Sequence, residues 1–68
     1  MKKYKVVADH GRTVNVRANP STGTAVLTAL PIGTEVRAMP SGKEGWLKVE
    51  IIKTGYIMEK YLQEDDSQ

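Results

Sequence analysis

The sequence predicts a small all-β domain, a barrel or a sandwich of about five short strands. Apolar residues alternate with polar ones in several short runs, the pattern of strands that bury one face. Turn-forming residues separate these runs, and the 68 residues include six Gly and three Pro. No segment shows the length and periodicity of a long helix, so an all-β architecture is favoured.

Two strands are expected near the start of the chain, at residues 4–8 and 13–17. One of the two Val residues of the first strand should face inward. A turn at residues 9–12 separates the strands, because Asp and Gly adopt turn conformations at low cost. The second strand alternates cleanly, so its two Val residues should be buried and Asn15 and Arg17 exposed.

The middle of the chain should contain the longest loop and two more strands. Residues 18–24 are dense in turn formers and predict the loop. Residues 25–30 are apolar at both parities, which fits a buried strand or a short helix, and their length favours the strand. After a turn at residues 31–34, residues 35–38 alternate again, with Val and Ala facing inward.

Residues 46–51 and 54–58 predict an antiparallel hairpin, around which the rest of the chain is organised. Both runs alternate with a period of two and include β-branched or aromatic residues. The register that places the apolar residues on one face makes two pairs: Val49 with Gly55, and Leu47 with Ile57.

The same register places Trp46, Lys48 and Tyr56 together on the outer face of the hairpin. The hairpin turn contains Ile51 and Ile52, which disfavour positive φ, so the turn must differ from an Asn-Gly turn. One of these Ile residues either caps the core or forms an exposed apolar contact.

The chain should end in a short helical or 3-10 turn at residues 59–62, which packs Tyr61 and Leu62 against the end of the barrel. Residues 63–68 form an acidic tail that should fray. We therefore expect a single domain over residues 1–68 with an ordered core at about 4–62.

Composition argues against several classes of function. Cys is absent and His10 is the only His, so neither a nucleophile–base pair nor a repeated metal-ligand spacing can be assembled. We therefore expect no enzymatic activity, no bound metal and no cofactor. A net charge of +2 without a basic stripe argues against nucleic acid. No run reaches transmembrane length, so no membrane insertion is expected, and the first residues lack the apolar segment of a signal peptide.

Six short motifs in order resemble bacterial SH3 domains, also called SH3b domains, from about Tyr4 to Leu62. These motifs are Val14-Asn15-Val16-Arg17, Pro20-Ser21, Gly33-Thr34 followed by Val36, Gly45-Trp46 followed by Lys48-Val49, Thr54-Gly55-Tyr56-Ile57, and Tyr61-Leu62. The resemblance implies a partly open SH3-like β-barrel of five to seven short strands with a short helical turn near the C-terminus.

The resemblance also implies a role as a targeting module. Such domains accompany cell-wall hydrolases and other secreted proteins, bind peptidoglycan or its peptides, and carry no catalysis themselves. The implied partners are peptidoglycan, a cell-wall peptide or an extracellular protein. The implied location is extracellular or cell-wall-associated, within a longer chain, and a monomer is expected. The acidic loop with which eukaryotic SH3 domains bind Pro-rich ligands is not visible in this sequence.

The candidate ligand-binding residues are Trp46, Tyr56, Lys48, Asn15 and Arg17. The first three could hold a sugar or a peptide by stacking beside a cation, although Trp46 fits equally well as a core residue. Asn15 and Arg17 could bind a peptide backbone or a carboxylate, or lie on a plain solvated face. Two other functions remain open: a structural or protein-interaction domain of a larger secreted protein, and, less favoured, a small nucleic-acid-binding barrel.

Overall fold

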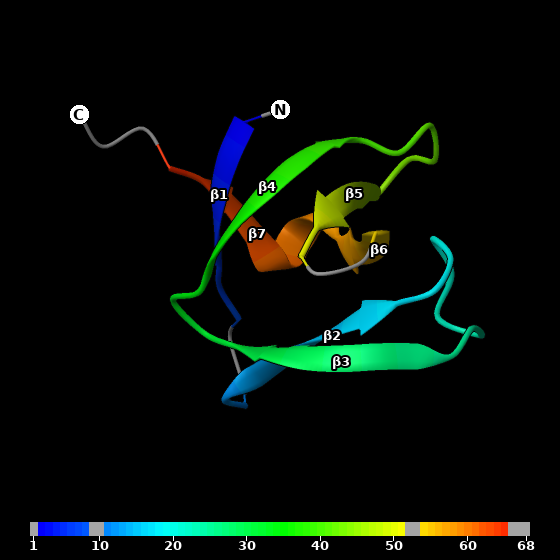
Figure 1. Cartoon of the computed structure of the whole chain (residues 1–68), viewed down its shortest axis with the longest axis horizontal. Helices are drawn as coiled ribbons and strands as arrows, with labels where there is room; N and C mark the ends of the chain where they lie inside the picture. Colours follow the sequence, from blue (N-terminus) through cyan, green and yellow to red (C-terminus); the bar gives the residue numbers. More distant parts are fainter. Residues whose placement is uncertain (1, 9–10, 52–53, 66–68) are drawn as a thin grey trace.

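The computed structural model describes residues 2–8, 11–51 and 54–65. Over these residues the chain forms seven antiparallel strands and one 3-10 turn, as the sequence predicts for a small all-β barrel. The elements are β1 (Lys2–Val6), β2 (Thr13–Arg17), β3 (Val26–Pro31), β4 (Glu35–Pro40), β5 (Trp46–Glu50), β6 (Thr54–Met58), η1 (Glu59–Tyr61) and β7 (Leu62–Glu64) (Figure 1).

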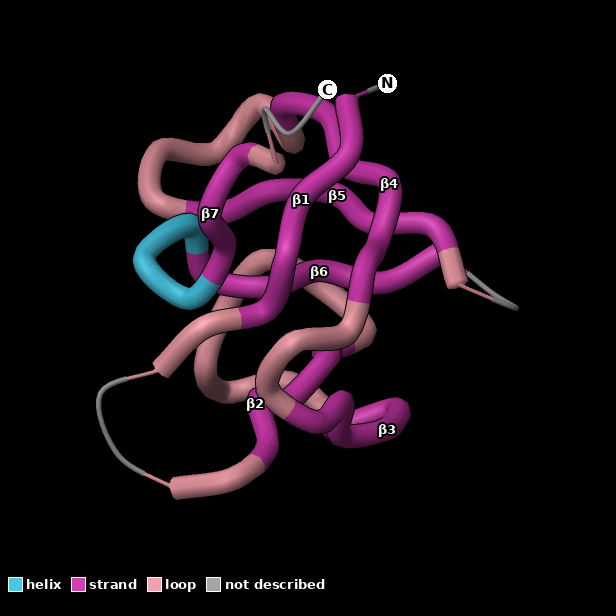
Figure 2. The backbone as a smooth tube through the Cα atoms, turned by 90° about the vertical axis from the view of Figure 1, so that its left-hand side faces the viewer, coloured by secondary structure: helices cyan, strands magenta, loops and turns pink. Residues whose placement is uncertain are grey.

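The strands lie in the order β3-β2-β6-β5-β4-β1-β7, so one strongly bent sheet makes both layers of the barrel. Figure 2 shows β1 and β4 crossing in front of β5 and β6, while β2 and β3 lie together at the opposite end from the chain termini. Backbone hydrogen bonds hold the end of β1 against the turn between β3 and β4: the amide of Val6 donates to the carbonyl of Thr34, and the amide of Gly33 donates to the carbonyl of Val6.

The core lies between these layers and is aliphatic. Each core residue comes from the inward parity of a strand, which confirms the predicted inward faces of the second strand, the 35–38 strand and the central hairpin. The cluster contains Val6, Val14, Val16, Val36, Ala38, Leu47, Val49, Ile57 and Leu62. Tyr61 packs against it from η1, and Leu62 is buried, as predicted for the end of the barrel.

The central hairpin has the predicted register. Val49 pairs with Gly55, and Leu47 pairs with Ile57. Gly55 is buried, and the space that a side chain would need there is filled by a methyl group of Val16. Of the two Ile residues of the hairpin turn, Ile51 is half-buried and packs against the core. The other, at position 52, lies outside the described residues.

The prediction that residues 25–30 form a buried strand is only partly right. The segment forms the strand β3, as the sequence favours, but this strand is not buried: Val26 is 46% and Leu27 44% exposed, and only Leu30 is half-buried among its six residues. The reason is its position at the end of the sheet, where it pairs with β2 alone. A bulge in this pairing, between Val16 and Arg17 of β2, shifts the β3 register by one residue.

The last strand, β7, also differs from prediction. Gln63 and Glu64 were expected in a fraying tail, but they belong to β7, which pairs with β1. A salt bridge of 3.3 Å between the Lys2 ammonium and the Glu64 carboxylate lies across this pair. At the other end of the chain, Lys2 and Lys3 belong to β1 and pair with β4, so the strands extend beyond the expected 4–62 in both directions.

Candidate functional site

The five candidate residues lie on one face of three adjacent strands. Arg17 of β2 pairs with Tyr56 of β6, and Tyr56 pairs with Lys48 of β5, so these three side chains form a row across the sheet. Asn15 and Trp46 lie two residues from Arg17 and Lys48 along their strands, and therefore on the same face. The tertiary structure thus joins two groups that are separate in the sequence.

Trp46 is not an exposed stacking surface. The residue is only 9% exposed, although it lies outside the main core cluster. Its backbone is also held: its amide donates to the carbonyl of Lys43, and its carbonyl accepts a 2.7 Å hydrogen bond from the Ser41 hydroxyl. Of the two roles that the sequence left open for this Trp, the structure favours the buried one. Tyr56 and Lys48 are half-buried, so the hairpin contributes one partly accessible ring and one cation.

Arg17 holds the long loop between β2 and β3. It is half-buried rather than exposed, and its Nη1 donates to the carbonyls of Thr22 at 2.8 Å and Thr24 at 2.9 Å. The Thr24 hydroxyl adds hydrogen bonds to the carbonyls of Asn19 and Ser21. This correction has a physical reason: the loop folds back over the end of β2 and needs a donor for carbonyls that no strand satisfies.

A groove of about 300 Å³ lies beside Arg17, on the same face as the candidate residues. Its walls come from the segment that follows β1, from β2, from the long loop, and from the junction of β6 with η1. The lining residues are Ala8, Thr13, Val14, Asn15, Arg17, Thr22, Met58 and Tyr61. The groove includes Asn15 and Arg17 among the predicted residues, but not Trp46, Lys48 or Tyr56.

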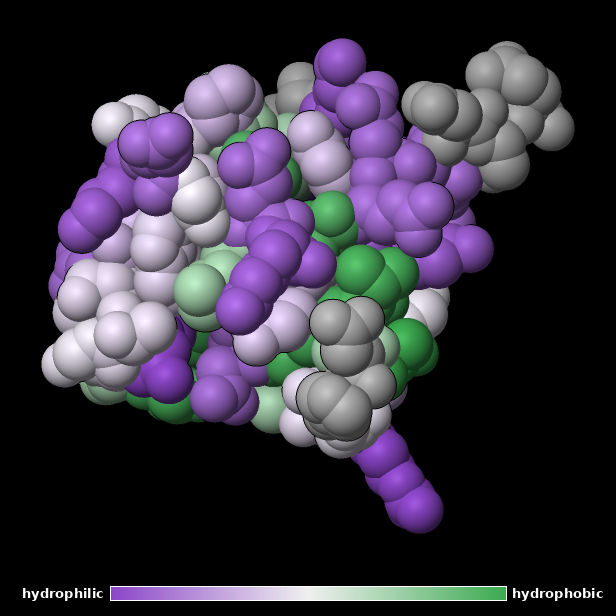
Figure 3. Space-filling view, turned by 180° about the vertical axis from the view of Figure 1, so that it is seen from behind, coloured by the Kyte–Doolittle hydropathy of each residue, from purple (hydrophilic) through white to green (hydrophobic). Residues whose placement is uncertain are grey.

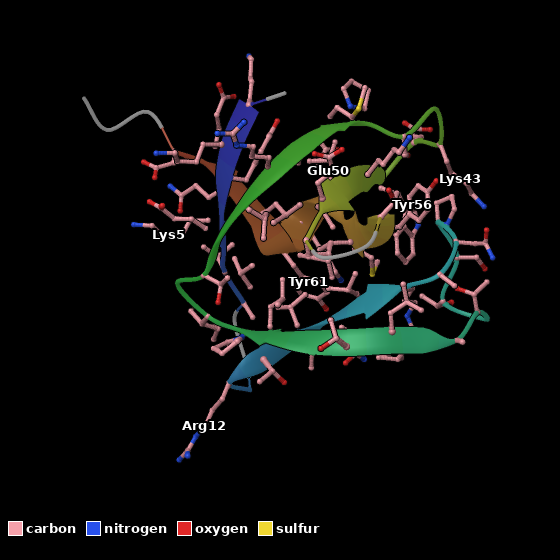
Figure 4. All side chains as sticks on the ribbon, in the orientation of Figure 1. Lys5, Arg12, Lys43, Glu50, Tyr56 and Tyr61 are labelled. Carbon is pink, nitrogen blue, oxygen red and sulfur yellow. The ribbon has the colours of Figure 1, made fainter. Side chains whose placement is uncertain are left out.

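Tyr61 is the groove residue whose position the sequence predicts only in part. It packs against the core, as expected, and it also lines the groove. The Lys60 ammonium lies 5.1 Å from the centre of its ring, a cation–π distance. Figure 4 shows Tyr61 between the β6–β7 region and β2, whereas Arg12 points away from the body of the molecule. No local pattern in the sequence indicates that η1 would lie beside β2.

A second surface hollow, of about 520 Å³, lies over β1, β4 and β5 and is a weaker candidate. Its charged side chains have both signs and lie opposite one another in the strand pairs, for example Arg37 opposite Glu50. Seen from behind, polar side chains cover the upper part of the molecule and a group of apolar side chains lies below them (Figure 3).

The remaining chemical candidates are a metal site and a catalytic base. Residues 2–8, 11–51 and 54–65 contain no group of three or more His, Cys, Asp or Glu side chains that could hold a metal ion. The Asp9–His10 turn, the only candidate for a base, lies outside the described residues. No described helix is long and apolar enough to cross a membrane.

Comparison with known protein families identifies the chain, whereas no curated protein matches it. The family described as the bacterial SH3 domain matches residues 12–63, well over half of the sequence. The match runs from the start of β2 into β7 and includes the groove residues on β2, in the long loop, on β6 and in η1. Together with the seven-stranded antiparallel barrel, this match shows that the chain belongs to the bacterial SH3 domain family.

Proposed function

We propose that this domain is a non-catalytic targeting module that binds a peptide of the bacterial cell wall in the groove beside Arg17. Membership of the bacterial SH3 family supports a binding role. The main support for the proposal is the composition of the groove. Its walls combine apolar surface from Ala8, Val14 and Met58 with polar groups from Thr13 and Asn15. A peptide presents the same combination, small side chains together with backbone donors and acceptors.

The size of the groove favours a short segment as the ligand. About 300 Å³ is at the lower end of the range for ligand pockets, enough for a few small residues of a peptide. Binding at so small a site should be weak, with a Kd of about 10 μM to 1 mM. Useful targeting then requires several copies or a covalently joined enzyme, which raises the effective concentration. We therefore propose that the domain acts outside the cell or at the wall, as a monomeric part of a longer protein.

The hairpin residues extend this surface. Tyr56 lies beside Arg17 in the strand pairing, and Lys48 lies beside Tyr56, so a longer peptide or a glycan leaving the groove would pass over them. Because Trp46 is buried, it offers little surface on which a ligand could stack. Replacing Tyr56 with Ala should therefore weaken wall binding less than blocking the groove.

The test is co-sedimentation with purified cell walls, using a variant that fills the groove. Asn15→Tyr places a large side chain at an exposed strand position that lines the groove. Thr28→Tyr is the matched control, since Thr28 is also an exposed strand position but does not line the groove. With both variants folded, we expect only Asn15→Tyr to stay in the supernatant. If both sediment like the wild type, the groove is not the site.

Two other outcomes would point to a different function. If the wild type does not sediment with walls at all, a structural or protein-interaction role becomes the better proposal. Binding to nucleic acid that falls steeply with salt would indicate the nucleic-acid alternative. The domain should also release no reducing ends or amino groups from walls; a release that His10→Ala abolishes would contradict the non-catalytic role.

A further inference from the structure

The groove has one unbalanced charge. Among the described residues that line it, Arg17 is the only charged one, and none is a carboxylate. The segment that contains β2, the long loop and β3 also carries only positive charge. From Gly11 to Thr34 the sequence contains no acidic residue, and its only basic residues are Arg12 and Arg17. The Lys60 ammonium, over the ring of Tyr61, adds a second positive charge near the groove. The described residues around the groove therefore favour an anionic ligand.

The hydrogen bonds of Arg17 leave its guanidinium arranged for such a ligand. A guanidinium has five N–H donors, two of them on Nη1. The two carbonyls of the long loop, from Thr22 and Thr24, account for the donors of Nη1. Nε and Nη2 make no hydrogen bond within the part of the chain that the structure describes. Their N–H groups point side by side, which is the geometry that binds both oxygens of a carboxylate.

The loop contacts also reduce the entropic cost of binding. An unrestrained Arg side chain loses considerable rotamer freedom when it orders on a ligand. Here two hydrogen bonds of 2.8 and 2.9 Å already restrain the guanidinium, and the residue is half-buried. Asn15, two residues earlier on the same face, offers an amide donor and acceptor to a neighbouring peptide group.

We propose that Arg17 makes the groove selective for peptides that carry a carboxylate beside small, uncharged residues. This inference rests on the proposed function and specifies its ligand. The carboxylate can be the C-terminus of the peptide or an acidic side chain within it. Both have the same chemistry, and Nε and Nη2 of Arg17 would bind either through two parallel hydrogen bonds.

The test is an NMR titration of the wild-type domain with three peptides. The first is acetyl-Lys-D-Ala-D-Ala with a free C-terminal carboxylate, the second is its C-terminal amide, and the third is acetyl-Ala-Glu-Ala-amide. The first peptide should bind at least about tenfold more tightly than its amide, equivalent to about 1.4 kcal/mol. If the third also binds more tightly than the amide, an internal acidic side chain serves as well as the C-terminus.

Two variants test the role of Arg17. Arg17→Gln removes the charge, keeps an N–H donor for the loop, and should reduce the binding of the free acid to that of the amide. Arg12→Gln removes the same charge from the residue just before β2. Arg12 points away from the body of the molecule and does not line the groove, so binding should not change (Figure 4). The comparison of acid with amide on the wild type stands even if Arg17→Gln loosens the loop.

The outcomes separate this inference from the proposed function. If acid and amide bind the groove equally, or if walls sediment the domain while no carboxylate peptide shifts the resonances of groove residues, the inference is wrong and the cell-wall role stands. If neither walls nor peptides bind, the proposed function fails and the inference with it. An equal loss of binding in Arg12→Gln and Arg17→Gln would show that net charge, rather than Arg17, is responsible.

Discussion

Replacing Gly55 with Ala should destabilise the domain even though strands normally prefer Ala to Gly. Gly55 is the second residue of β6 and has ordinary φ, so the backbone itself accepts a side chain. A Cβ atom there would collide with Cγ1 of Val16 and lie 3.5 Å from both the Arg17 carbonyl oxygen and Cδ1 of Leu27. Val16 is fully buried and cannot rotate into solvent.

The size of the effect follows from this packing. Forcing an extra methyl group into a filled core costs about 1–3 kcal/mol. The gain from replacing Gly in a strand, about 0.5–1 kcal/mol, offsets only part of this cost. Since the core of so small a domain rarely supplies more than about 3–5 kcal/mol, Gly55→Ala should lower the urea midpoint markedly.

The assay is urea unfolding followed by the fluorescence of Trp46, the only Trp. Gly23→Ala is the control, because Gly23 is exposed and has ordinary φ. A Cβ there would lie 3.8 Å from the nearest atom, the Ser21 Oγ. The Gly23→Ala variant should therefore be as stable as the wild type or slightly more stable. The double variant with Val16→Ala should be more stable than the two single costs predict, because the new methyl group fills the vacated space. Strictly additive costs, or a Gly55→Ala variant as stable as the wild type, would refute the proposed collision.

Three further predictions follow from the same packing and hydrogen bonds. Val49→Ala should lower the free energy of unfolding by about 1–3 kcal/mol, because Val49 is fully buried, whereas Lys48→Ala at a half-buried position should lower it by less than about 0.5 kcal/mol. Thermal melts that give the opposite ranking would mean a shifted register. The emission of Trp46 should be blue-shifted and poorly quenched by acrylamide, and strong quenching would contradict its burial. Thr24→Val should cost about 1 kcal/mol in urea unfolding, since the hydroxyl makes hydrogen bonds within the loop, and an unchanged midpoint would show that these contribute nothing.

The sequence by itself determined most of the strands and the core. A period of two says which residues of a strand share a face, and it correctly identified Val14 and Val16 and the inward residues of the central hairpin. The register of Val49 with Gly55 also followed from local pattern, because only one alignment places all the apolar residues on one face. These are local properties, so they are readable along the chain.

Only the tertiary structure decided how deeply each strand is covered. The apolar run containing Val26 and Leu27 resembles a buried strand, but burial depends on what packs over a strand, and β3 lies at the end of the sheet. Gln63 and Glu64 show the reverse case: their polarity indicates a tail, yet the free edge of β1 supplies the backbone partners that order them.

The candidate site depended on tertiary structure most of all. The sequence selected Asn15 and Arg17 but did not place them beside Tyr61, because their proximity results from η1 packing at the end of β2. It also could not show that Arg17 gives two hydrogen bonds to its own loop, since the loop carbonyls reach it only when the chain folds back. Alternation along a strand determines which way a side chain points, whereas its partners come from segments that are distant in sequence.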